Sequence, residues 1–167
     1  MRRLIFNMSK YEVILSTIIL VVFPNFLLTA PSHRVSPVKN EYRHLCDKLP
    51  AYCKIIIDES LSNNLDPYLI GAVIMHESWG GQQYLRGGDG EYGLMQVMPY
   101  NFPQHINTDY ERFDAKNNIK YGTKHLRYCY DLRKSVKLAL SCYNKGPYAV
   151  LQPRYVDAVR KQYHALK

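Results

Sequence analysis

An apolar run near the start of the chain predicts an export segment. Residues 13–28 are apolar at all but four positions, and they follow a basic stretch with Arg2, Arg3 and Lys10. A basic start followed by such a run is typical of an export signal. The run is slightly shorter than the roughly 20 residues that cross a bilayer, so a cleaved signal and a retained anchor both remain open. We therefore assign residues 1–30 to an export signal or N-terminal membrane anchor.

The rest of the chain has the apolar periodicity of helices. Residues 31–38 contain two prolines and two serines, which predicts a linker, and residues 39–167 are enough for one domain. Residues 80–92 contain five glycines and predict a loop or small hairpin with its turn at 87–90. We expect a mainly α fold in which this Gly-rich segment connects two helices. The predicted helices cover residues 39–47, 50–62, 67–78, 114–130, 135–144 and 153–166.

One helix is apolar on most of its faces and ends in a carboxylate. Asp66 and Pro67 are a favourable N-cap and first helical residue, and Leu69 to Met75 are nearly all apolar. This composition predicts a central, buried helix. Glu77 stands near its C-terminus, where an acid opposes the helix dipole. Burial would raise the pKa of Glu77 and let it donate a proton near neutral pH, although a salt bridge or a capping role is an equally good interpretation of the spacing alone.

The charge of the chain indicates an anionic partner without selecting it. Lysine and arginine number 22 against 14 acids, for a net charge of +8. Without residues 1–30, which carry three of these cations and one acid, the net charge is near +6. Nucleic acid, a membrane or a wall polymer would suit such a surface. No block of basic residues or nucleic-acid-binding motif is present, so we predict no nucleic-acid partner.

Four cysteines remain in the part of the chain that we expect to be exported. Cys46, Cys53, Cys129 and Cys142 could form two disulfides with three possible connectivities. Their spacings differ from those of zinc sites, so we predict no metal and no cofactor.

Four blocks along the chain, taken in order, carry a resemblance to a known family. They are residues 65–78, which end in Glu-Ser, residues 93–99 (GLMQVMP), residues 118–126, and residues 143–147 (YNKGP), the last of them followed by residues 155–159. They resemble the catalytic domain of lytic transglycosylases, a branch of the lysozyme-like superfamily, and the resemblance implies an α+β lysozyme-like fold with the Gly-rich segment beside the active-site cleft. Together they span essentially the whole predicted domain. The resemblance implies cleavage of the β-1,4 bond between N-acetylmuramic acid and N-acetylglucosamine in peptidoglycan, with formation of 1,6-anhydro-muramic acid.

The resemblance also implies roles for residues around the glutamate. Glu77 would be the catalytic acid and then the base. Ser78 would support the turn behind it, and we count Ser78 with the substrate-binding positions. Tyr143 would lie close to Glu77, Asn144 would help to fix the local geometry, and Tyr155 would reach the glutamate from the last helix.

Two further positions would line the cleft, and one loop departs from the family pattern. Met95 would line the cleft, and Gln96 would hydrogen-bond a sugar substituent. The stretch 84–91 is longer than usual and lacks the expected serine, and it is similar in part to goose-type lysozymes. Asp89 or Glu91 could therefore hold a water molecule as a second carboxylate, which would make the protein a lysozyme.

The expected setting is the cell envelope. The resemblance implies that the partners are peptidoglycan glycan strands, and a secretion, conjugation or phage assembly is a further candidate. We expect a monomer in the periplasm or cell envelope that meets the membrane only through its N-terminal segment, anchored by residues 13–30 if that segment is retained. A wall-binding component of a secretion apparatus with weak activity is the remaining alternative.

Overall fold

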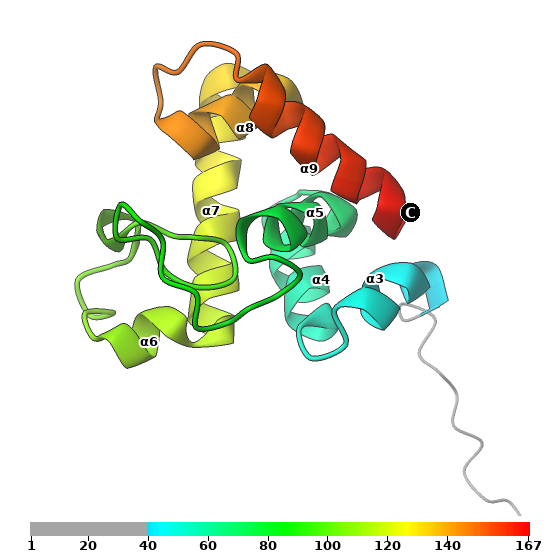
Figure 1. Cartoon of the computed structure of the whole chain (residues 1–167), viewed down its shortest axis with the longest axis horizontal. Coiled ribbons are helices and arrows are strands. Elements are labelled where there is room, and N and C mark those ends of the chain that lie inside the picture. The colour runs from blue at the N-terminus through cyan, green and yellow to red at the C-terminus, as the bar shows by residue number, and fades with distance from the viewer. Residues whose placement is uncertain (1–39) are drawn as a thin grey trace, which may run out of the picture. The chain divides into compact units, whose positions relative to one another are not determined.

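The computed structural model describes residues 40–167. The predicted export segment and linker lie outside the described residues, as does the first residue of the helix expected at 39–47. No helix in the described part is both long and apolar enough to cross a membrane. The fold is mainly helical, as predicted. Figure 1 shows α5 (Pro67–Glu77) near its centre, with α9 (Pro153–Leu166) above it and α4 (Cys53–Ser62) below it in this view.

Two short helices precede the central one. They are α3 (Arg43–Lys48) and α4 (Cys53–Ser62). The prediction that a helix opens at Pro50 was wrong, because residues 50–52 form a turn. Leu49, just before this turn, is buried in the core. The N–H of Tyr52 donates to the Leu49 carbonyl (3.0 Å), which closes the turn before α4 begins.

The central helix α5 (Pro67–Glu77) begins as its sequence predicts. The Asp66 carboxylate accepts the backbone N–H of Tyr68 (2.9 Å), and Pro67 occupies the first turn. Asn64 has a left-handed φ of 51°, which separates α4 from α5. The side chains of Ile70, Val73 and Ile74 are fully buried. Burial on several faces holds this helix rigidly, so its C-terminal residues are well placed to carry chemistry.

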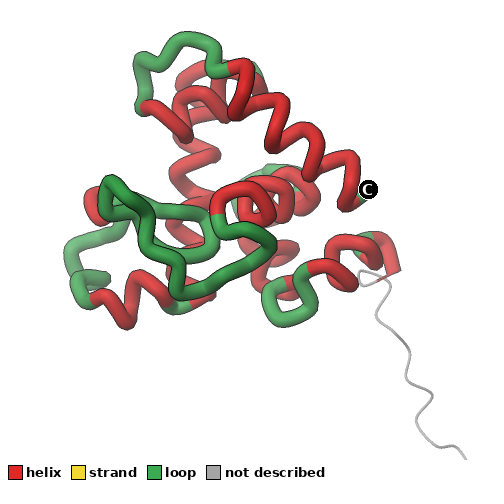
Figure 2. Tube along the Cα trace, viewed as in Figure 1, coloured by secondary structure: helices red, strands yellow, loops and turns green. Residues whose placement is uncertain are grey.

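The segment after α5 is the largest non-helical part of the described chain. Figure 2 shows it as a broad loop beside α5 and α7. Two isolated antiparallel bridges, Arg86 to Tyr92 and Tyr92 to Val97, are its only β structure within residues 40–167. The Gly90 N–H donates to the Gly87 carbonyl (3.3 Å), so the predicted hairpin turn is present.

Four helices and one 3₁₀ turn complete the domain. They are η1 (Pro99–Asn101), α6 (Asp109–Phe113), α7 (Ala115–Arg133), α8 (Val136–Lys145) and α9 (Pro153–Leu166). Helix α6 was not predicted, although Thr108 and Glu111 form a capping box at its start. Helix α7 runs three residues beyond the predicted end at Tyr130, and α9 has the predicted bounds.

The cysteines form two disulfides, which resolves the connectivity that the sequence left open. Cys46 pairs with Cys53 across the turn between α3 and α4, and Cys129 pairs with Cys142 between α7 and α8. A loop of this second size stabilises a fold by roughly 3 kcal/mol on the chain-entropy model. The second bridge therefore fixes α8, whose last turn lies at the site described next.

Candidate active site

Glu77 is the last residue of α5, and its side chain is partly buried. Burial raises its pKa from an ordinary value of 4.5 to about 7, and the negative charge of Glu91 adds to this increase. The fully buried Ser78 ends the helix, and its hydroxyl donates to the Ile74 carbonyl (2.8 Å). Ser78 thus supports the turn, and it is not among the residues that line the pocket described below, although it was counted with the substrate-binding positions.

Tyr155 contacts the glutamate directly. It lies in the first turn of α9, and its hydroxyl donates to Glu77 Oε1 at 2.6 Å. This hydrogen bond stabilises the ionised carboxylate and partly offsets the effect of burial on its pKa. Burial and the charge of Glu77 hold the pKa of Tyr155 well above 10, so the phenol stays protonated as a donor. The ring of His76 packs edge-on against Tyr155, with 5.1 Å between the ring centroids.

The segment from Gly93 to Val97 forms a tight turn beside Glu77. Tyr92 and Val97 exchange both backbone hydrogen bonds (3.0 and 2.9 Å), and Gln96 adopts a left-handed φ of 46°. The side-chain amide nitrogen of Gln96 donates to the Gly93 carbonyl (2.8 Å) and the Leu85 carbonyl (3.2 Å). Gln96 therefore joins this turn to the hairpin loop while its side chain lines the pocket.

The side chain of Asn118 on α7 also holds this turn in place. Its side chain is fully buried, accepts the Met95 N–H (2.8 Å) and donates to the Tyr92 carbonyl (2.7 Å) and the Arg112 carbonyl (3.0 Å). Each buried backbone group that it satisfies would otherwise cost free energy. Asn118 is therefore the residue that connects the turn to the helical core.

Met95 is a core residue, which corrects the prediction that its side chain lines the cleft. It is fully buried, and a Cβ placed at Gly122 would lie 2.6 Å from the Met95 sulfur and 2.7 Å from its Cβ. Gly122 thus lets α7 approach the turn closely. The Met95 carbonyl instead serves the site, because it accepts the hydroxyl of Tyr143 at 2.6 Å.

Glu77 and Gln96 line a pocket of about 300 Å³. Tyr143 and Asn144 line it from α8, and Asp89, Glu91 and Gln96 line it from the loop segment. Glu91 Oε2 accepts the N–H of Asp89 (3.0 Å), so its carboxylate is held on the pocket wall. The other lining residues are Val97, Met98, Tyr100, Asn101, His125, Lys145, Gly146 and Pro147.

Comparison with known proteins identifies the family of this chain. Residues 54–164 match the family described as the transglycosylase SLT domain. The chain belongs to this SLT family. Its fold is similar to the X-ray structure of an inactive mutant of the lytic transglycosylase Slt from Pseudomonas aeruginosa, with a TM-score of 0.50 and 19% sequence identity. This match covers 68% of the chain but spans only 22% of the Pseudomonas chain, so the similarity concerns the fold of one region of that protein.

Eight residues that line this pocket of the SLT domain were not among the predicted site residues, and three of the eight have ionisable side chains: Tyr100, His125 and Lys145. His125 on α7 packs against Tyr143, with 5.2 Å between the ring centroids, and burial lowers its pKa, so it is neutral at neutral pH. Lys145 lies in the block of residues 143–147, and Tyr100 directly follows the block of residues 93–99. His125 is one helical turn after Gly122, and this spacing was the signal that could have placed it on the pocket side of α7.

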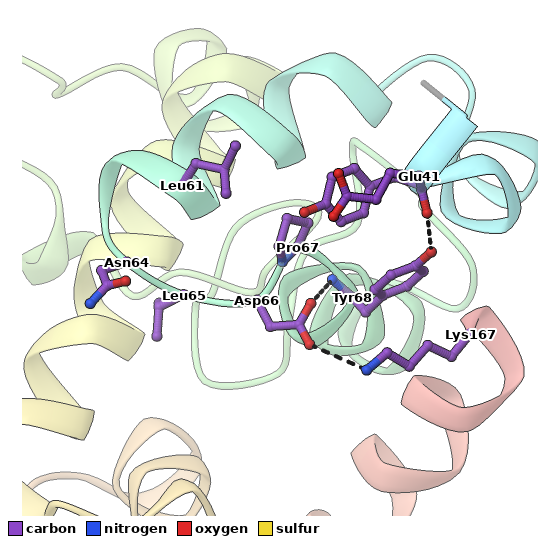
Figure 3. A pocket seen from close by; sticks show the side chains of 9 residues that line it. Glu41, Leu61, Asn64, Leu65, Asp66, Pro67, Tyr68 and Lys167 are labelled. Carbon is purple, nitrogen blue, oxygen red and sulfur yellow. Dashed lines mark hydrogen bonds and ion pairs between the residues drawn. The ribbon is translucent and has the colours of Figure 1, made fainter. Parts of the chain in front are cut away.

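A second pocket of the SLT domain lies at the opposite end of α5 and has a volume of about 450 Å³. Figure 3 shows that Asp66, Tyr68 and Lys167 interact with other residues of this pocket. The Asp66 carboxylate caps α5 and lies 4.0 Å from the Lys167 ammonium, and the Tyr68 hydroxyl donates to the Glu41 carbonyl (2.9 Å). The Glu77 pocket is therefore the candidate active site. Residues 40–167 contain no group of three or more His, Cys, Asp or Glu side chains that could hold a metal ion.

Proposed function

We propose that the protein is a peptidoglycan lytic transglycosylase in which Glu77 is the catalytic residue. The observation that carries the proposal is a carboxyl group in the pocket whose pKa of about 7 allows both protonation states near neutral pH. The most effective acid or base has a pKa close to the working pH. Family membership supports the same reaction class.

The reaction needs two proton transfers at one residue. Protonated Glu77 gives its proton to the glycosidic oxygen, and the bond from that oxygen to the muramic acid C1 breaks. The 6-hydroxyl of the same sugar then attacks C1, and the ionised Glu77 accepts the hydroxyl proton. The product is the 1,6-anhydro sugar, and the carboxyl group is restored. Tyr155 stabilises the ionised stage through its hydrogen bond.

Two substitutions should move the pH dependence in opposite directions. Activity falls as pH rises through the Glu77 pKa, because the first step needs the protonated acid. Tyr155→Phe removes a donor that stabilises the charged form of Glu77, so the alkaline limb of kcat/KM moves to higher pH. The value of kcat/KM near neutrality nevertheless falls roughly tenfold, because the same hydrogen bond stabilises the carboxylate that forms when Glu77 gives up its proton. Glu91→Gln removes a like charge, so the limb moves to lower pH. Limbs that move the same way in both variants would contradict this account.

The proposal is tested by mass spectrometry of the muropeptides released from purified peptidoglycan. Products ending in 1,6-anhydro-muramic acid, absent when Glu77→Gln is used, support it. Products heavier by one water, with reducing ends, would show hydrolysis instead.

A lysozyme-type hydrolase is the second candidate, because Asp89 and Glu91 line the same pocket as Glu77. Such an enzyme needs a second carboxylate to activate water. We expect Asp89→Asn to keep at least about half of the activity and the same anhydro product, because Asp89 is exposed on the loop. An activity loss of about a hundredfold or more in this variant, at unchanged stability, would favour the hydrolase.

The cellular setting follows from the substrate. We propose that residues 39–167 act outside the cytoplasm, in the periplasm or cell envelope, on glycan strands of the wall, and that residues 1–30 direct export. Local wall opening for a secretion, conjugation or phage assembly would suit one small domain. If the protein binds sacculi and releases no fragments, a binding component of such an assembly would be the better assignment.

A further inference from the structure

A single lysine lies on the wall of the catalytic pocket. Lys145 is the last residue of α8, and with Gly146 and Pro147 it forms the edge of the pocket that contains Glu77. Its side chain is exposed. The proposed acid–base chemistry does not use an ammonium group at this position.

The charge of Lys145 is not neutralised within the described part of the chain. The ion pairs of residues 40–167 involve other cations, and none joins Lys145 to a carboxylate within 4.0 Å. Asp89 and Glu91 line the same pocket from the hairpin loop, yet neither is within this distance. The pocket therefore has an acidic wall on the loop and a separate cationic edge at the end of α8.

The substrate of the proposed reaction is itself unevenly charged. Each muramic acid carries a lactyl ether whose carboxyl group is either free or joined to a stem peptide that has carboxylates of its own. N-acetylglucosamine is neutral. An anion would be repelled from the wall formed by Asp89 and Glu91 and attracted to the edge formed by Lys145. The charge distribution thus favours a placement in which the carboxylate of a muramic acid unit lies near Lys145 and away from Asp89 and Glu91.

We propose that Lys145 binds a carboxylate on the muramic acid side of the glycan strand and so contributes to the choice of anionic over neutral strands. This inference rests on the proposed function. A cation in the last turn of a helix also interacts favourably with the helix dipole, which is a purely structural role. A structural role would alter stability, and it would not depend on the charge of the substrate.

The test compares Lys145→Gln with Lys137→Gln. Both changes remove one exposed lysine from α8, but Lys137 lies away from the catalytic pocket. Three substrates are used: strands with stem peptides, strands stripped of peptide by an amidase, and stripped strands whose lactyl carboxyl has been converted to a neutral amide. For Lys145→Gln we expect KM to rise about tenfold on at least one of the two anionic substrates, with kcat changed by less than about twofold. KM on the amide should not change, and Lys137→Gln should match the unsubstituted protein throughout.

The pattern among the substrates identifies the carboxylate. A rise in KM on stripped strands assigns the lactyl carboxylate, and a rise only on peptide-bearing strands assigns the stem peptide. An equal rise on the neutral amide, or no rise on any substrate, would overturn the proposal.

A binding measurement separates this proposal from the proposed function. Retention on sacculi is compared for Glu77→Gln with and without Lys145→Gln, at low and high salt. Weaker and less salt-dependent retention of the double variant supports the role of Lys145, even if the unsubstituted protein releases no fragments and the proposed function fails. Equal retention of the two variants would overturn the role of Lys145 and leave the proposed function untouched.

Discussion

Glu77→Gln is expected to reduce muropeptide release by about a thousandfold or more and to make the protein more stable at alkaline pH. The loss of activity follows because glutamine can neither give a proton to the leaving oxygen nor accept one from the attacking hydroxyl. The gain in stability follows because an ionised carboxylate at this buried position costs free energy that a neutral amide of the same shape does not.

The pH dependence of this gain has a definite sign. The pKa of Glu77 rises from 4.5 to about 7 on folding, so the folded state binds the proton more tightly than the unfolded state. Stability is therefore lost as pH rises from 4.5 to about 7, and the loss is complete above that range. Because Glu77 is partly exposed, we expect Glu77→Gln to add about 2 kcal/mol to the free energy of unfolding near pH 8 and almost nothing near pH 4.

Urea unfolding of both proteins across this pH range measures the difference. Asp157→Asn is a suitable control, because Asp157 is an exposed acid on α9 that lies outside the pocket. A stability difference for Glu77→Gln that does not grow with pH would contradict the raised pKa. Retained activity would contradict the catalytic role.

Asn118→Ala is expected to lower the free energy of unfolding by about 3 kcal/mol or more and to abolish most of the activity. The substitution leaves two backbone groups without their partner, the Met95 N–H and the Arg112 carbonyl, and it removes one of the two hydrogen bonds that the Tyr92 carbonyl accepts. The turn that carries the Met95 carbonyl would loosen, and this carbonyl is the acceptor that holds Tyr143 in the pocket.

The neighbouring residue provides a matched control. Asn117 is also on α7, and its side chain makes one hydrogen bond, to the Glu111 carbonyl (3.0 Å), at a partly exposed position. Asn117→Ala should cost about 1 kcal/mol or less and keep the activity. Thermal or urea unfolding of the two variants decides the matter. Similar losses of stability in both would show that Asn118 does not anchor the turn.

The sequence predicted those features that depend on short stretches of chain. Asp66 and Pro67 define the start of α5 locally, and the hairpin turn at Gly87 to Gly90 follows from glycine content. The capping box of Thr108 and Glu111 is equally local, and its signal was present in the sequence although α6 was not predicted. The helical fold was accessible for the same reason, since periodicity and capping are properties of neighbouring residues.

The features that were missed depend on contacts between distant segments. Met95 lies in a block typical of the cleft, but its side chain packs in the core against Gly122, which has no side chain to block this position. Asn118 contacts residues 23 and 26 positions away, and no local pattern shows those hydrogen bonds. Cysteine spacing alone left three pairings open, and only the packing of α3 on α4 and of α7 on α8 selects one.

The most direct test of the central claim is to run the cleavage in water enriched in a heavy oxygen isotope. The account predicts that the new muramic acid ends are 1,6-anhydro and contain no heavy oxygen, because the sugar's own 6-hydroxyl attacks in place of water. These products should disappear with Glu77→Gln. Reducing ends that carry one heavy oxygen would contradict the account and assign the protein as a hydrolase.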